Sequence, residues 1–218
     1  MARKIQKKRV EKKAVLIAFE DSKSSKYYFR DLLRDKELTG QVILVNRDKG
    51  QDPKRVFEKI GEYKQKNLNE VFEKEWIVID KDNWSKDKYL GVIDRGRKEK
   101  ICIAFSNDAY ELWILLHFEP LTRSTHRKEL NSKLNQIFLE KCGKKYEKSS
   151  QDVYLLIRDL QETAIKNAKN LVKQHLRDYG KIDSNKNPIT TVYQLVECLN
   201  SLYSKEKNCD CFPNKGNI

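Results

Sequence analysis

WIVID, residues 76–80, is a run of four apolar side chains that ends in an acid, and three similar runs occur elsewhere in the chain. These are AVLIAF (14–19), QVILVN (41–46) and ICIAFS (101–106). Short runs that are apolar throughout are typical of strands buried on both faces, as in a parallel sheet covered by helices. The sequence therefore predicts an α/β fold with a mostly parallel, four-stranded sheet.

Helical patterns separate these strands. Apolar side chains fall on one helix face in two of the connections, as Tyr28, Phe29, Leu32 and Leu33 in the first and as Val56, Phe57, Ile60 and Tyr63 in the second. Asp52 and Pro53 precede the second helix as N-cap and first-turn residue. We expect a helix or turn over 86–97 and a mostly apolar helix over 108–118, capped by Asn107 or Asp108.

The pattern changes after Pro120. Residues 125–141, about 151–178 and 190–204 read as helical, without a convincing strand, and Leu160, Ala164, Ala168 and Leu171 share one side of the long helix. We therefore divide the chain into a basic arm (1–13), an α/β domain (14–120), a helical subdomain (121–204) and a flexible tail (205–218).

The chain of 218 residues has a formal net charge of +13, and its first thirteen residues are rich in Lys and Arg. Such a surplus suits a polyanion, because each Lys or Arg placed on a phosphate releases condensed counterions. A solubilising tail is the structural alternative, and a membrane surface is a further one. No apolar run approaches the length of a membrane span and no signal peptide is visible, so we expect a cytoplasmic protein.

The five cysteines are odd in number and scattered, which predicts no disulfide framework. Cys209-Asp-Cys211 offers two metal ligands, without the second pair or the histidines that a structural zinc site needs. The pair reads as part of the tail, with metal binding or redox activity as the alternative.

Acids close two of the apolar strands: Glu20 follows AVLIAF, and Asp80 and Asp82 follow WIVID. The carboxyl ends of parallel strands meet at one edge of a sheet, so we expect these three side chains to lie together. Clustered carboxylates repel one another unless a hard cation such as Mg²⁺, or Mn²⁺, offsets their charge. Such a metal activates water and neutralises charge on a phosphodiester. The alternative is that each acid caps a helix or is solvated.

Glu111 and His117 both lie in the apolar stretch 108–118. Asn107 and Glu111 are four residues apart, which on a helix places them on one face toward the strand end. Glu111 is therefore a candidate fourth carboxylate, as a metal ligand or general base, or else a surface acid. His117 is six residues further on and does not share that face, so we interpret it as a core histidine.

Several basic and amide side chains are candidates for holding a nucleic acid backbone. Lys23, Lys26 and Arg30 follow Glu20 into the first helix, where a solvated helix face is the alternative. The full set is Lys23, Lys26, Arg30, Lys81, Asn107, Lys166 and Asn167.

Several of these motifs resemble those of the RloB-like family. The resemblance is carried by Glu20 with Lys23 and Tyr27-Tyr28-Phe29, by Asp80-Lys81-Asp82, by SNDAYELWILLHF (106–118), by AIKNA (164–168) and by NPITTV (187–192). It covers residues 14 to about 200, and the segment 106–118 is its most specific part. It implies a Toprim-like core, Mg²⁺-dependent cleavage of DNA or RNA, a role in restriction-linked or abortive-infection defence against viruses, and an ABC-type ATPase as partner.

The chain also departs from the family pattern. Asp21 follows Glu20 where the family usually has glycine, and the later acid of the family is replaced near Ser25. Asn83-Trp84 stands in place of Asp-His, and Asp108 stands in place of proline. We predict a metal-dependent nuclease in which Asp80 and Asp82 bind the metal, Glu20 binds it or acts as general base, and Glu111 is an additional candidate ligand. A non-catalytic subunit that binds the ATPase and nucleic acid, and a primase-like or topoisomerase-like enzyme, are the alternatives. The sequence leaves open DNA against RNA, and association with a second copy.

Overall fold

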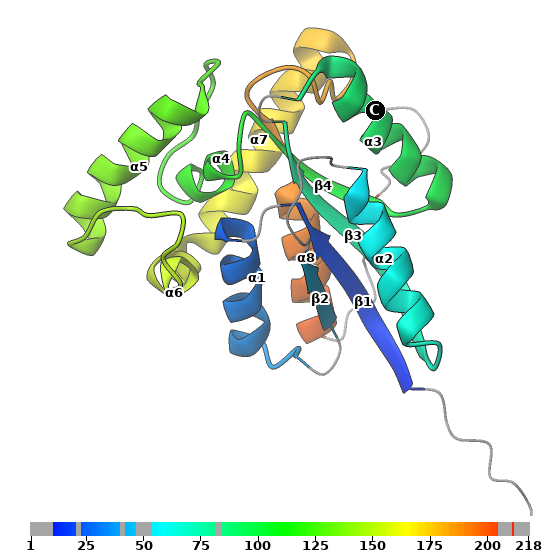
Figure 1. Cartoon of the computed structure of the whole chain (residues 1–218). Helices are drawn as coiled ribbons and strands as arrows, with labels where there is room; N and C mark the ends of the chain where they lie inside the picture. Colours follow the sequence, from blue (N-terminus) through cyan, green and yellow to red (C-terminus); the bar gives the residue numbers. More distant parts are fainter. Residues whose placement is uncertain are drawn as a thin grey trace, which may run out of the picture.

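The computed structural model of the chain describes residues 11–20, 23–39, 42–46, 54–81, 84–204 and 211 (Figure 1). In the first half, strands and helices alternate as β1 (Glu11–Phe19), α1 (Ser24–Asp35), β2 (Val42–Asn46), α2 (Arg55–Lys66), β3 (Glu70–Asp80), α3 (Lys86–Glu99) and β4 (Cys102–Asn107). In the second half, mostly helical segments follow, namely α4 (Glu111–Leu115), α5 (Arg127–Cys142), α6 (Val153–Ile157), the 3-10 helix η1 (Arg158–Leu160), α7 (Gln161–Tyr179), β5 (Ile189–Thr190) and α8 (Val192–Tyr203).

The described strands form one sheet in the order β2-β1-β3-β4-β5, in which only β5 is antiparallel to its neighbour. Helices α2 and α3 cover one face of the sheet, and α1 and α8 cover the other (Figure 1). Because both faces are covered, the middle strands are buried: Leu16 and Ile17 of β1 and Trp76 and Ile77 of β3 have no exposed surface. The predicted α/β fold and its four parallel strands are confirmed.

The predicted helix faces are also buried. Tyr28, Phe29, Leu32 and Leu33 of α1 belong to the core, as do Val56, Phe57 and Ile60 of α2 and Ala164, Ala168 and Leu171 of α7. The proposed start of α2 at Asp52 and Pro53 lies outside the described residues. Gly143 and Gly180, with φ of 71° and 68°, end α5 and α7 in the left-handed conformation that glycine adopts without steric cost.

The prediction of no strand after Pro120 is wrong. Strand β5 pairs with β4, with Ile189 opposite Asn107 and Thr190 opposite Ser106. Thr190 Oγ1 donates to the Phe105 carbonyl at 3.0 Å, so this threonine joins the segment before α8 to the sheet. A two-residue strand is too short to show an alternating pattern.

The helix predicted over 108–118 is only five residues long, because β4 continues to Asn107 and α4 begins at Glu111. Neither predicted cap acts on α4. Asn107 Nδ2 donates to the Ser184 carbonyl at 3.0 Å, and Asp108 Oδ2 accepts from the Arg127 backbone N–H at 2.9 Å. The expectation that Asn107 and Glu111 share one helix face is therefore wrong.

The prediction about the cysteines is also corrected. Cys102 of β4 and Cys211 form a disulfide, with their Cα atoms 5.6 Å apart, and Cys198 is disulfide-bonded as well. Both residues of the first bond are buried. Apart from Cys211, the proposed tail at 205–218 lies outside the described residues. Separately, no helix in the described ranges is long and apolar enough to cross a membrane.

Candidate metal centre

Glu20 and Asp80 lie side by side at the carboxyl edge of the sheet. Parallel pairing sets Phe19 opposite Val78, and the Glu20 backbone N–H continues the ladder to the Val78 carbonyl at 3.0 Å. The Asp80 backbone N–H then donates to Glu20 Oε2 at 3.2 Å. The structure thus brings two of the three predicted acids together from strands that are about sixty residues apart in sequence.

The third predicted acid, Asp82, lies outside the described residues. Within the described ranges, no three His, Cys, Asp or Glu side chains are gathered closely enough to hold a metal ion. Two carboxylates still fit Mg²⁺, which typically takes one or two carboxylates and keeps several waters.

The second oxygen of Glu20 contacts a tryptophan. Trp84 Nε1 donates to Glu20 Oε1 at 2.8 Å. Trp84 also forms two hydrogen bonds with Lys81. The Trp84 backbone N–H donates to the Lys81 carbonyl at 3.0 Å, and the Trp84 carbonyl accepts from Lys81 Nζ. Lys81, a predicted phosphate contact, is therefore half-buried, and its ammonium is bound to the backbone.

Tyr89 of α3 belongs to this site although the sequence did not point to it. Its side chain is fully buried, and its hydroxyl has no hydrogen-bond partner among the described residues. Burial raises the pKa of Tyr89 well above 10, and the negative charges of Asp80 and Glu20 raise it further. In the sequence, Tyr89 reads as one apolar position of a helix, so no pattern distinguishes its hydroxyl. A buried hydroxyl without a partner among the described residues, within the field of two carboxylates, fits a site for hydrated metal, since a metal-bound water would satisfy it.

Glu111 is fully buried, and its neighbours differ from those expected. Its Oε1 accepts from the Tyr146 hydroxyl at 3.2 Å and pairs with Lys148 Nζ at 2.8 Å, both from the segment between α5 and α6. It forms no three-acid group with Glu20 and Asp80. The structure thus gives Glu111 a partner of opposite charge, Lys148.

The predicted phosphate contacts fall into two groups. Lys23 and Lys166 are exposed and Lys26 is half-buried, so these ammonium groups face solvent at least in part. The others hold the fold: Asn107 contacts Ser184 as described above, Arg30 pairs with Asp31 at 2.7 Å and also contacts Gln151, and Asn167 Nδ2 donates to the Leu116 carbonyl at 2.8 Å.

His117 is a core histidine, as predicted. Its Nδ1 contacts the Trp113 carbonyl at 3.0 Å and its Nε2 contacts the Tyr28 hydroxyl at 3.3 Å. Burial lowers the pKa of His117 from 6.5 to about 4. From Tyr28 the polar contacts continue to Gln161 at 3.4 Å and on to Asn200 at 2.9 Å, so one chain of contacts links α4, α1, α7 and α8.

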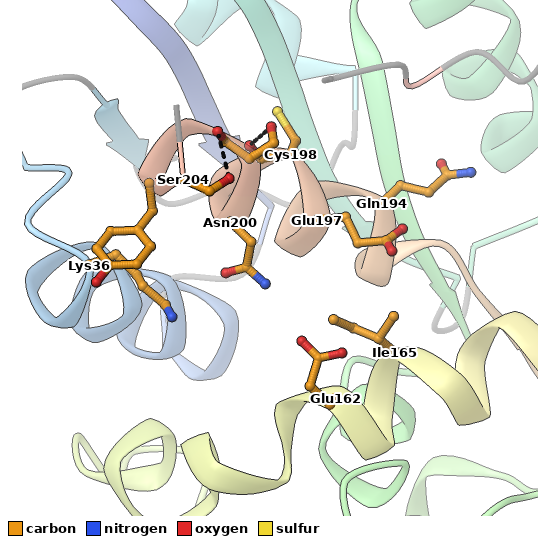
Figure 2. A pocket seen from close by; sticks show the side chains of 10 residues that line it. Lys36, Glu162, Ile165, Gln194, Glu197, Cys198, Asn200 and Ser204 are labelled. Carbon is orange, nitrogen blue, oxygen red and sulfur yellow. Dashed lines mark hydrogen bonds between the residues drawn. The ribbon is translucent and has the colours of Figure 1, made fainter. Parts of the chain in front are cut away.

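A cleft of about 680 Å³ lies beside Asn200, the residue at which this series of polar contacts ends. Figure 2 shows Glu162 and Ile165 of α7 on one side, Glu197 and Asn200 of α8 on the other, and Lys36 at the end of α1. None of the predicted site residues lines it. The cleft is therefore separate from the candidate metal centre.

The family model described as RloB-like protein matches residues 15–199. No curated protein matches, and no solved structure does. The matched range contains Glu20, Asp80 and every helix that packs on the sheet except the end of α8. The chain belongs to the RloB-like protein family.

Proposed function

We propose that this chain is a metal-dependent nuclease in which Glu20 and Asp80 bind Mg²⁺ or Mn²⁺ and a phosphodiester of DNA or RNA is cleaved. The observation that carries the proposal is the hydrogen bond from the Asp80 backbone N–H to the Glu20 carboxylate, which places both residues at the carboxyl edge of a parallel sheet. Ligand sites of open α/β sheets lie at that edge. The buried Tyr89 hydroxyl has no hydrogen-bond partner among the described residues, and the charges of both acids act on it, so it offers a polar group for a water near the site.

Each protein group has a separate task in this proposal. The carboxylates of Glu20 and Asp80 hold the cation, which when bound neutralises phosphate charge and lowers the pKa of a water. Basic side chains that follow the two acids in sequence hold the nucleic acid backbone. These are Lys23 and Lys26 after Glu20, and Lys86 and Lys88 after Asp80, of which all but Lys26 are exposed. Such contacts are independent of base sequence, and they suit the net charge of +13.

The family resemblance supports a role in antiviral defence in the cytoplasm, with an ABC-type ATPase as partner. The second candidate is a non-catalytic subunit that binds this ATPase and nucleic acid. It is favoured by Trp84, which stands where the family has histidine and contacts Glu20 directly.

A cleavage assay separates the two candidates. The purified chain, with and without its ATPase partner, is given Mg²⁺ or Mn²⁺ together with tRNA, total RNA, supercoiled DNA or single-stranded DNA. Asp80→Ala removes a proposed ligand, and Asp87→Ala, which removes an exposed acid of α3, is the matched control. We expect cleavage by the wild type and by Asp87→Ala, and none by Asp80→Ala. Equal cleavage by Asp80→Ala, or none by the wild type under any condition, would refute the nuclease.

A further inference from the structure

The side chain of Trp84 contacts a proposed metal ligand directly. Its indole Nε1–H reaches Glu20 Oε1 at 2.8 Å, although the two residues are 64 positions apart. A 2.8 Å bond from N–H to a carboxylate oxygen lies in the short, charge-assisted range. The indole therefore contributes to the orientation of the carboxylate.

The indole itself is held in place. Two hydrogen bonds join the backbone of Trp84 to Lys81. The Trp84 N–H donates to the Lys81 carbonyl, and the Trp84 carbonyl accepts from Lys81 Nζ. On the ring, Lys88 Nζ lies 5.8 Å from the centroid, within the range of a cation–π contact. Because backbone and ring are both fixed, the N–H has a set direction.

Glu20 is oriented from two sides. Trp84 binds Oε1, and the Asp80 backbone N–H binds Oε2. Together these donors use two of the roughly four lone-pair positions that a carboxylate offers, so neither prevents an oxygen from binding a cation. A carboxylate fixed through both oxygens is pre-organised as a ligand, which lowers the entropy lost when metal binds.

We propose that Trp84 is a positioning residue for Glu20, and that its indole N–H sets the carboxylate orientation in which Glu20 and Asp80 bind one divalent cation together. This inference rests on the proposed function. Removing a hydrogen-bond partner of a metal ligand typically lowers metal affinity 10- to 100-fold. Because Trp84 is half-buried, phenylalanine at this position keeps most of the packing.

Calorimetric titration with Mn²⁺ tests the inference without any activity assay. Trp84→Phe removes the N–H, and we expect its dissociation constant for Mn²⁺ to rise about 10-fold or more. Asp87→Ala is the control, because it removes an exposed acid of α3 close to Trp84 in sequence and keeps the indole N–H; we expect a change of less than about twofold. An unchanged Mn²⁺ affinity in Trp84→Phe would overturn the positioning role.

A second measurement uses the wild-type chain and does not depend on how a variant folds. The chain has three tryptophans, and therefore three indole N–H signals in a proton–nitrogen NMR spectrum. We expect saturating Mg²⁺ to shift one of them, with the same midpoint as the calorimetric binding curve. If Mg²⁺ binds and none of the three signals shifts, Trp84 does not position Glu20.

The two proposals fail in different ways. If wild-type protein binds no Mn²⁺, or binds it equally well with Glu20→Gln, the metal site itself is wrong. If the wild type binds Mn²⁺ through Glu20 but Trp84→Phe binds it equally well, only the inference about Trp84 is wrong.

Discussion

The backbone N–H of Asp80 donates to Oε2 of Glu20 across 3.2 Å, and it joins the last residue of β3 to the residue that follows β1. Strand register sets this contact, because Phe19 and Val78 pair one and two residues before these acids. Amide replacements of the two side chains therefore remove charge and leave the strands where they are. On this basis the chemistry of the site can be tested separately from its stability.

Lys148 neutralises a carboxylate that has no exposed surface. Removing one partner of a buried pair leaves an uncompensated charge, at a cost of about 3–5 kcal/mol when both groups are buried. Lys148 is 40% exposed, so we expect Lys148→Met to lower the free energy of unfolding by about 2–3 kcal/mol in urea titrations. In a Glu111→Gln background the same change should cost much less, and equal costs in both backgrounds would contradict the pairing.

Glu111→Gln also tests whether Glu111 is a metal ligand. Since Glu111 forms no three-acid group with Glu20 and Asp80, we expect the Mn²⁺ affinity of Glu111→Gln to stay within about twofold of wild type. A loss of tenfold or more would return Glu111 to the ligand set. The measurement is calorimetric titration, with Asp80→Asn as the positive control.

His117 should make stability depend on pH. Its pKa is about 4 in the folded state against 6.5 when unperturbed, so the unfolded chain binds more protons between these values. The contribution of His117 is therefore complete above pH 6.5 and is lost as the pH falls toward 4. Urea titrations at pH 7 and pH 5 should differ by about 2 kcal/mol from this residue, and His117→Gln should reduce the difference by that amount.

His175 adds a background to this comparison. Burial lowers the pKa of His175 too, so it contributes to the pH dependence in the same direction and should remain as a background in His117→Gln. An identical pH dependence in wild type and His117→Gln would contradict the assignment.

Two glycines of α3 provide a matched pair for packing. A Cβ at Gly96 would lie 2.5 Å from Ile103 Cγ1 and 2.9 Å from the Ile101 carbonyl, whereas a Cβ at Gly91 meets nothing within 4 Å. We expect Gly96→Ala to lower the free energy of unfolding by about 1–3 kcal/mol through overpacking. Gly91→Ala should raise it by about 0.5–1 kcal/mol through helix propensity. If both substitutions changed the free energy of unfolding in the same direction in urea titrations, α3 would have to pack differently on β4.

The Cys102–Cys211 disulfide closes a long loop, with 109 residues of sequence separation. Loops of this length favour stabilisation of about 2–4 kcal/mol by restricting the unfolded chain. Cys211→Ser should lose that amount under oxidising conditions, and the difference from wild type should shrink with excess dithiothreitol. Cys142→Ser, at the free half-buried cysteine, is the control. No difference between Cys211→Ser and wild type in oxidising buffer would contradict the bond.

The regular parts of the fold were predictable because their signals are local. The apolar runs before Glu20 and Asp80 are long enough to identify strands, and the rule that parallel strands end at one edge brings the two acids together. The helix faces of α1 and α2 follow from spacing alone.

The features that the sequence did not reveal depend on contacts between distant segments. Strand β5 is two residues long and exists because Thr190 bonds to β4. Glu111 looked like a site residue because the Lys148 that neutralises it comes from a later loop. In the sequence, Trp84 precedes the predicted helix over 86–97 and Tyr89 reads as one of its apolar positions. Only the folded structure brings the Trp84 indole N–H to Glu20 and buries the Tyr89 hydroxyl where the charges of Asp80 and Glu20 act on it.

The most direct test of the central claim is a crystal structure of the wild-type chain in saturating Mn²⁺, with data collected at a wavelength where Mn²⁺ scatters anomalously. The account predicts an anomalous peak bound by carboxylate oxygens of both Glu20 and Asp80, and its absence from crystals of Asp80→Asn. The absence of an anomalous peak between Glu20 and Asp80 in wild-type crystals would contradict the proposed metal site. A peak that remains in crystals of Asp80→Asn would contradict it as well.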